Sequence, residues 1–155
     1  FDLDPDKSLS FDKLRLGVKY LKEILDNLNL KSFLKTSGGK GYHICIPFKN
    51  NLTWKKFYKI SEDIANIIEN THSELFTTNN RKEKRKNKIF IDYLRNQKSA
   101  TFVAPYSVRL RKNAPVSMPI AWNELDKIKP NEITIYKAIK RLKKKDPWKD
   151  FFTSN

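Results

Sequence analysis

The chain has 155 residues, of which 32 are Lys or Arg and 17 are Asp or Glu, so its formal net charge is +15 at neutral pH. Its single cysteine excludes an internal disulfide framework, and Cys and His together are too few for a structural zinc site. No apolar run reaches the roughly 18–20 residues of a membrane span. We therefore expect a basic intracellular protein whose partner is a polyanion, most often nucleic acid.

The first half of the chain predicts strands that alternate with helices. Ser10 and Thr53 are suitable N-caps, and each precedes a run in which apolar residues recur every three or four positions, as on one face of a helix. These helices are expected at 11–28 and 54–68. The strands of this half are expected at residues 1–4, 32–36 and 42–48.

The second half is more basic and is expected to complete the same sheet. Residues 71–88 are polar and basic and predict a loop. Strands are expected at 89–94, 100–104 and 108–111, followed by helices at 119–127 and 134–145. Strands that alternate with helices predict an α/β or α+β fold, with helices packed on a sheet in one domain.

Two carboxylates lie close together at the start of the chain. Residues two apart on a strand point to the same face, so Asp2 and Asp4 project together while Leu3 turns into the core. One or two carboxylates together with substrate phosphates are the usual ligands of Mg²⁺ in proteins. An Asp-x-Asp-Pro sequence is also ordinary turn and capping chemistry, so the residues alone leave both interpretations open.

A third carboxylate, Asp92, interrupts a hydrophobic strand. A carboxylate in such a setting is costly unless a cation, a metal or hydrogen bonds compensate it, although the solvent face of an edge strand would also accept it. With Asp2 and Asp4 it would complete a site for two metal ions roughly 3.5–4 Å apart.

Three of the four glycines stand in one short segment, KTSGGKGYH, at residues 35–43. Glycines allow backbone N–H groups to turn toward an anion, and Lys and Ser add a charge and a hydroxyl donor. The order of a Walker loop is absent, and a hairpin turn is the alternative. We favour phosphate contact. Further basic residues occur in the clusters 81–88 and 137–145 and at Arg109 and Arg111.

Four segments, in the right order, resemble the polymerase domain of bacterial DNA ligase D, which belongs to the archaeo-eukaryotic primase superfamily. They are FDLDP, KTSGGKGYHICIP, KIFIDYLRN and ATFVAPYSVRLRKNAPVSMPIAWNEL, and the similarity extends through nearly all of residues 1–148. The resemblance implies an RRM-like primase catalytic core, in which a mixed or antiparallel sheet carries packed helices and presents carboxylates at one face.

The resemblance also implies roles for individual residues. The catalytic, metal-binding residues that it implies are Asp2, Asp4 and Asp92. The nucleotide-binding residues that it implies are Ser37, Lys40, His43, Arg85 and Arg109. The implied cofactor is Mn²⁺ or Mg²⁺ in a two-metal site, and the implied activity is the transfer of nucleotides from nucleoside triphosphates to DNA ends in non-homologous end joining. Ku and a ligase domain or chain are implied as further partners, in a cytoplasmic, nucleoid-associated setting.

Residue 1 is Phe and the one methionine is Met118, so we expect the sequence to be a piece of a longer protein. By resemblance, residues 1–155 form a single domain that is the catalytic half of a ligase D-type polymerase domain, without the upstream module. We expect this piece to extend a primer poorly or not at all. The alternatives are a non-catalytic nucleic-acid-binding module with an RRM-like fold and a metal-dependent nuclease, and metal-dependent nucleotide binding would separate the three.

Overall fold

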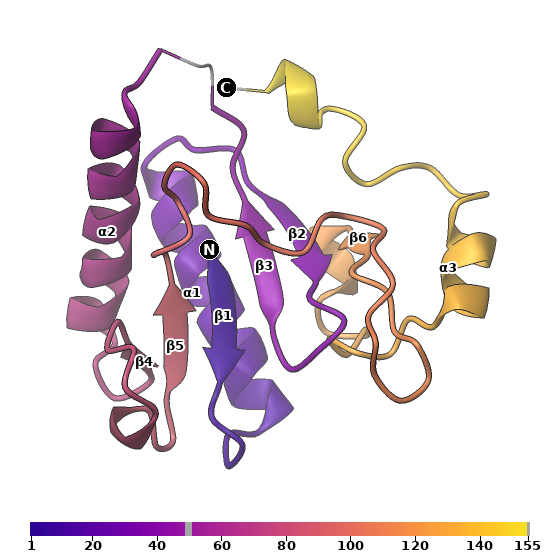
Figure 1. Cartoon of the computed structure of the whole chain (residues 1–155), viewed down its shortest axis with the longest axis horizontal. Helices are drawn as coiled ribbons and strands as arrows, with labels where there is room; N and C mark the ends of the chain where they lie inside the picture. The colour runs from indigo at the N-terminus through magenta and orange to yellow at the C-terminus, as the bar shows by residue number, and fades with distance from the viewer. Residues whose placement is uncertain (49–50, 155) are drawn as a thin grey trace.

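The structure is a computed structural model that describes residues 1–48 and 51–154. Within these residues, six strands form one sheet in the order β4-β5-β1-β3-β2-β6 (Figure 1). The β4–β5 pair is parallel and the other neighbouring strands are antiparallel, so the sheet is mixed, in agreement with what the resemblance implies. The strands are β1 (Asp2–Pro5), β2 (Phe33–Thr36), β3 (Tyr42–Cys45), β4 (Phe76–Thr77), β5 (Ile89–Asp92) and β6 (Pro119–Ile120).

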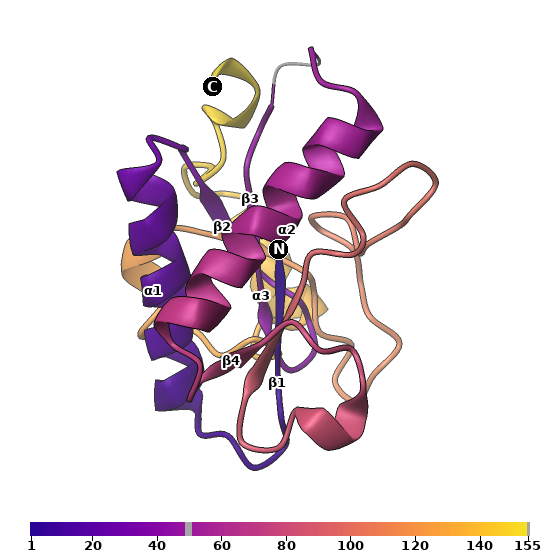
Figure 2. The same ribbon diagram turned by 90° about the vertical axis from the view of Figure 1, so that its left-hand side faces the viewer.

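Two long helices pack on this sheet. In Figure 1, α1 (Phe11–Asn27) lies behind the sheet and α2 (Trp54–Thr71) lies along its β4 edge, and Figure 2 shows the same pair from the side. Both predicted N-caps are confirmed, because the hydroxyls of Ser10 and Thr53 accept hydrogen bonds from backbone N–H groups at the third following residue. The sheet face opposite α1 is left to other segments of the chain.

The core lies between the sheet and these two helices. Leu3 is fully buried between the two aspartates of β1, as predicted from its position on the strand. The helices contribute buried residues at helical spacing, which are Leu14, Val18, Leu21, Leu25, Ile64, Ala65 and Ile68. The apolar spacing therefore predicted both helices correctly.

The C-terminal part covers the far edge of the sheet. The third helix, α3 (Ile135–Arg141), is joined to the 3₁₀ turn Trp122–Glu124 by an ion pair between Arg141 and Glu124 at 2.8 Å. Farther along the chain, the Trp148 indole donates a hydrogen bond to the Leu34 carbonyl at 2.9 Å. This bond fixes the end of the chain against β2.

Several predicted elements are wrong. Residues 100–104 form no strand, and 108–111 has only a single bridge, between Val108 and Val116. Tyr106, Asn113 and Ala114 have positive φ angles, so the chain turns here instead of extending. The predicted helix at 119–127 begins instead as the edge strand β6, where a proline without an N–H is tolerated.

Two smaller differences concern a short strand within a predicted loop and the length of another strand. The predicted loop 71–88 contains β4, whose Phe76 is fully buried, and the 3₁₀ turn Lys82–Lys84. The strand expected at 42–48 ends at Cys45, just before a segment that contains Pro47, which has no N–H to donate.

Candidate active site

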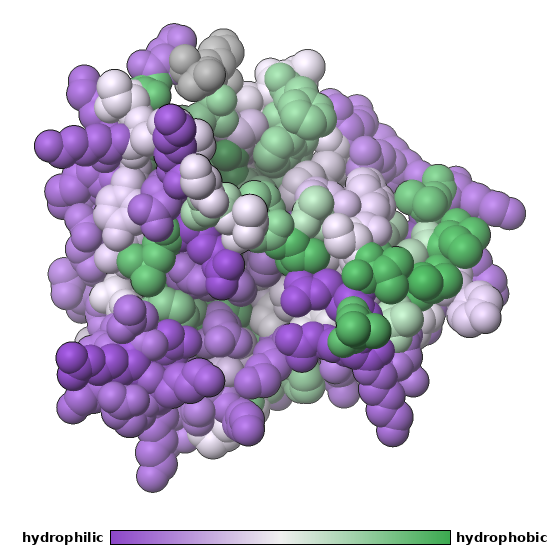
Figure 3. All heavy atoms as spheres, viewed as in Figure 1, coloured by the Kyte–Doolittle hydropathy of each residue, from purple (hydrophilic) through white to green (hydrophobic). Residues whose placement is uncertain are grey.

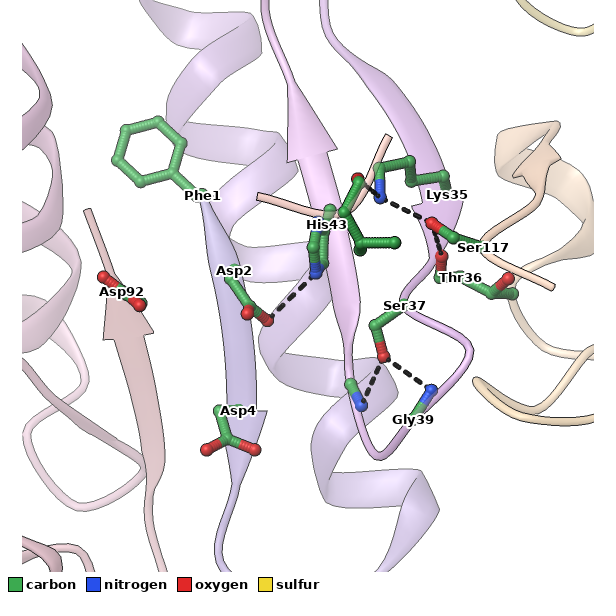
Figure 4. A network of polar contacts seen from close by, with 12 residues as sticks. Phe1, Asp2, Asp4, Lys35, Thr36, Ser37, Gly39, His43, Asp92 and Ser117 are labelled. Atoms are coloured by element: carbon green, nitrogen blue, oxygen red, sulfur yellow. Dashed lines mark hydrogen bonds and ion pairs between the residues drawn. The ribbon is translucent and has the colours of Figure 1, made fainter. Parts of the chain in front are cut away.

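A row of four polar side chains crosses the sheet on the face opposite α1. Lys35 is the register partner of His43, and His43 is in turn the partner of Asp2. On the other side of β1, Asp2 is the partner of Asp92. Partners in antiparallel strands project to the same face with Cβ atoms about 4.5–5.5 Å apart. We call Lys35, His43, Asp2 and Asp92 the polar row; Figure 4 shows them on one face.

Asp2 lies at the centre of the polar row and contacts His43, with 3.4 Å between the carboxylate Oδ1 and the imidazole Nε2. Burial alone would raise the pKa of Asp2, but the hydrogen bond and the charge of His43 outweigh it, and the pKa is lowered. Burial lowers the pKa of His43 from 6.5. At neutral pH the pair is therefore a carboxylate beside a largely neutral imidazole.

Asp4 projects to the same face two residues beyond Asp2. Burial raises its pKa, and the negative charges of Asp2 and Asp92 raise it further, while Lys40 and Arg85 oppose this. The guanidinium of Arg85 lies 3.8 Å from the Asp4 carboxylate and over the ring of Phe90, 3.6 Å from its centroid. The structure thus brings Arg85, a predicted nucleotide-binding residue, next to a predicted metal ligand.

Asp92 is compensated by local partners. Its carboxylate accepts a hydrogen bond from Arg95 Nε at 2.9 Å and another from the backbone N–H of Leu94 at 3.1 Å. Arg95 also donates to the carbonyl of Thr101 at 3.0 Å. The cost of a carboxylate in a hydrophobic strand is therefore met here by an arginine.

The three aspartates suit a hard divalent cation as a donor set. No three His, Cys, Asp or Glu side chains in the described part of the chain stand close enough to hold a metal ion by themselves. Mg²⁺, however, usually takes one or two carboxylates together with substrate phosphates. Burial raises the pKa of Asp4, and repulsion from Asp2 and Asp92 adds to this rise; a cation at this face would relieve that repulsion. Asp2, Asp4 and Asp92 are the residues that would hold it.

The glycine segment joins β2 to β3 beside these carboxylates. The Ser37 hydroxyl oxygen accepts hydrogen bonds from the N–H groups of Gly39 and Gly41 at 3.1 and 3.2 Å, and the N–H of Gly38 donates to Pro130. The amides of all three glycines are thus used within the chain, and they do not turn toward an anion as the sequence suggested. The hydroxyl proton of Ser37 is still available as a donor.

Three cations surround this turn. Lys40 is exposed at its tip. Arg109 donates to the Ser37 carbonyl at 3.3 Å, and Arg111 lies against Gly39. Predicted residues Ser37, Lys40 and Arg109 therefore meet at one end of β1, whereas His43 lies in the polar row against Asp2. We call Ser37, Lys40, Arg109 and Arg111 the basic turn.

Comparisons with known proteins identify the family and the fold of this chain. A family model described as the LigD primase-polymerase domain matches residues 1–148. The chain belongs to the LigD primase-polymerase family. The predicted fold class is confirmed by a structural match to such a domain, the polymerase domain from Mycobacterium tuberculosis ligase D in complex with DNA. The match has a TM-score of 0.88 and 26% sequence identity, and it covers 98% of this chain and 53% of that one.

Relatives within the LigD family are much longer than this chain. The multifunctional non-homologous end joining protein LigD of Pseudomonas aeruginosa is 36% identical over 154 residues, which are 97% of this chain and 18% of that protein. The bifunctional LigD protein of Bacillus subtilis is 32% identical over 154 residues, covering 97% of this chain and 25% of that protein. The chain therefore spans a quarter or less of these relatives. Among the described residues, no helix is long and apolar enough to cross a membrane.

Sequence reasoning missed three residues at this LigD-type site. In the sequence Lys35 is only the start of the glycine segment, yet it lies in the polar row and is fully buried. The signals for the other two are weak: Arg95 follows Asp92 by three positions, and Phe102 interrupts a run of small residues. Their contacts depend on how the segment after β5 crosses the sheet, which no local pattern reveals.

Proposed function

We propose that the chain is the catalytic part of a metal-dependent nucleotidyltransferase that adds nucleotides to DNA ends in non-homologous end joining. The observation that carries this proposal is the grouping of Asp2, Asp4 and Asp92 on one sheet face, with the basic turn at one end of it. Nucleotidyl transfer requires carboxylates that hold metal ions and a nearby cluster of groups that bind phosphate. The names of the LigD relatives, which refer to end joining, supply the setting.

In this proposal each part of the site has one task. Ser37, Lys40 and Arg109 bind the β- and γ-phosphates, because they offer a hydroxyl and two cations on one side of the carboxylates. Mn²⁺ or Mg²⁺, when bound by the aspartates, would lower the pKa of a primer 3′-hydroxyl and neutralise the pyrophosphate that leaves. His43 holds Asp2 in place through their contact. Arg85 offsets the charge of Asp4, and in this proposal it also contacts the phosphates of the bound nucleotide.

The proposed macromolecular partner is the end of a DNA duplex. The net charge of +15 favours a polyanion, and in Figure 3 hydrophilic side chains cover the lower left of the molecule, where residues 79–88 lie. Exposed lysines of this segment are Lys82, Lys84 and Lys86. Ku and a ligase domain or chain, in the cytoplasm at the nucleoid, complete the proposed setting.

Titration calorimetry tests the nucleotide site directly. Residues 1–155 should bind ATP with Mn²⁺, and Asp92→Asn should abolish the metal-dependent part of this binding. Lys40→Ala should weaken ATP binding about 10- to 150-fold, the effect of one lost charge-assisted contact, and leave Mn²⁺ binding nearly intact. Asp63→Asn, at an exposed position of α2 that is paired with Lys59, is the matched control.

Primer extension tests the reaction. The protein as its gene encodes it should extend a primer in Mn²⁺ or Mg²⁺ and lose this activity with Asp92→Asn. Cleavage of DNA without nucleotide incorporation would favour the nuclease alternative instead, because hydrolysis needs the carboxylates but not a triphosphate site.

A further inference from the structure

The polar row ends at Lys35, whose role the nucleotidyl-transfer scheme does not explain. Lys35 is fully buried, although it carries a charge that costs free energy to remove from water. Burial lowers its pKa to about 8. A residue of this kind needs specific partners, and those partners indicate what it holds.

The partners of Lys35 lie in the segment that crosses the sheet face. Its ammonium donates to the Val103 carbonyl at 3.0 Å and to the Ser117 hydroxyl at 2.7 Å. It also lies 5.7 Å from the centroid of the Phe102 ring, within the range of a cation–π contact. We call residues 100–105 the strap. Figure 1 shows this part of the chain passing in front of the sheet after β5.

The strap is held at two points of the polar row. Arg95 joins Asp92 to the carbonyl of Thr101, and Lys35 holds the carbonyl of Val103 two residues later. Phe102 lies between these two anchors. Its ring centroid is 6.2 Å from that of His43, yet 57% of the residue is exposed. The two cations therefore fix an exposed aromatic ring beside the catalytic carboxylates.

Phe102 lines a cavity of about 590 Å³ that also includes Asp2, His43 and Asp92 in its wall. Phe1 and Cys45 line it too, and both lie beyond the polar row, on the side away from the basic turn. No residue of the basic turn belongs to this wall. The carboxylates thus lie between the basic turn, which would bind phosphate, and an apolar cavity lined by the ring of Phe102.

We propose that the base of the bound nucleotide lies in this cavity against the ring of Phe102, and that Lys35 is a positioning residue that holds this ring in place. The inference rests on the proposed function. A nucleoside triphosphate whose β- and γ-phosphates lie at the basic turn and whose α-phosphate lies at the aspartates must extend its nucleoside to the far side of the polar row. Stacking on an aromatic ring accepts every base, because each base has a π-face.

Two probes separate the base from the phosphates, namely ATP and inorganic tripolyphosphate, each titrated with Mn²⁺. Phe102→Ala should weaken ATP binding about 5- to 150-fold, the usual effect of one lost base stack. It should leave tripolyphosphate binding unchanged, whereas Phe102→Trp should restore ATP binding. Tyr136→Ala, an exposed aromatic position on α3, is the matched control. Equal weakening of both probes by Phe102→Ala would overturn the assignment.

Lys35→Met keeps the length of the side chain and removes its charge and donors. It should reproduce the selective loss of ATP binding, and the double variant with Phe102→Ala should bind ATP no more weakly than Phe102→Ala alone. Additive losses, or wild-type ATP binding by Lys35→Met, would refute the positioning role. Lys143→Met, an exposed position, controls for the change in net charge.

The failures of the two proposals differ in this experiment. If the wild-type chain binds neither ATP nor tripolyphosphate with Mn²⁺, the proposed function fails and the inference fails with it. If it binds both with equal affinity, and neither Phe102→Ala nor Lys35→Met changes this, the phosphate site stands and the base site is refuted.

Discussion

Gly41 lies where the glycine segment enters β3, and a side chain at this position would collide with β1. A methyl group there would stand 1.8 Å from the carbonyl oxygen of Leu3, whereas ordinary contact begins at 3.4 Å. Both the oxygen and the neighbouring carbonyl carbon, at 2.9 Å, belong to the backbone, so rotation of a side chain cannot relieve the contact. Strand β1 would have to move by about 1.6 Å, a distance that breaks its pairing with β3.

We therefore expect Gly41→Ala to lower the free energy of unfolding by about 3 kcal/mol or more, the upper end of what overpacking costs when the surroundings cannot adjust. The variant should also lose Mn²⁺-dependent ATP binding, because Leu3 lies between Asp2 and Asp4. Gly39→Ala is a control within the same turn: its methyl would meet its nearest neighbour, the Ser37 hydroxyl, at 3.4 Å. It should be neutral or stabilise the fold by about 0.4–1 kcal/mol.

Urea unfolding of the two variants, followed by circular dichroism, measures this difference. If the unfolding free energies of Gly41→Ala and Gly39→Ala differ by less than about 0.5 kcal/mol, the turn does not approach β1 closely, and the geometry of the aspartates must be revised with it.

Two further predictions concern charge. The logarithm of DNA affinity should fall with the logarithm of salt concentration, and Ser substitutions at three exposed lysines should reduce this slope by up to about 2.7, at about 0.9 per phosphate; an unchanged slope would place the DNA elsewhere. The three lysines are Lys82, Lys84 and Lys86. Because burial lowers the pKa of Lys35 from 10.5 to about 8, its charge costs the folded state most below pH 8, and this cost disappears toward pH 10.5. Relative to Lys35→Met, the wild-type protein should gain about 2–3 kcal/mol of unfolding free energy between pH 7 and pH 10, and parallel stability profiles would contradict this.

The elements predicted correctly are those whose stability depends on local pattern. Helices α1 and α2 follow directly from apolar residues at helical spacing and from the hydroxyl caps at Ser10 and Thr53. The sequence also predicts β1, from the alternating FDLD that Pro5 closes, and β5, from the β-rich run IFIDYL. The fold class followed from the alternation of these elements.

The strap and β6 were not predictable in this way. Residues 100–104 have a β-rich composition, but two cations, the nearby Arg95 and the distant Lys35, bind their carbonyl groups in place of a neighbouring strand. Pro119 suggests the start of a helix, yet it lies in the edge strand β6, because the outer side of β2 is open to pairing with it. Both outcomes depend on β2, which supplies Lys35 to the strap and pairs with β6 although it lies far from both in the sequence.

The site likewise combines features that a local pattern predicts with features that depend on contacts between distant residues. The common direction of Asp2 and Asp4 follows from strand geometry alone. That Asp92 lies directly opposite Asp2 follows from the register of two strands that are separated by most of the chain, and only the resemblance to the LigD family anticipated it. The engagement of the glycine amides by Ser37 could not be predicted, since the same sequence allows them to face an anion.

Anomalous diffraction from crystals grown with Mn²⁺ and a non-hydrolysable ATP analogue tests the central claim, that this sheet face is a catalytic metal site. We predict an anomalous peak about 2.1 Å from carboxylate oxygens of Asp2 and Asp92, with a phosphate oxygen of the nucleotide in the same coordination shell. Asp92→Asn crystals should lose this peak. Nucleotide bound at the basic turn without a metal ion at these aspartates, or a peak that survives in Asp92→Asn, would contradict the account.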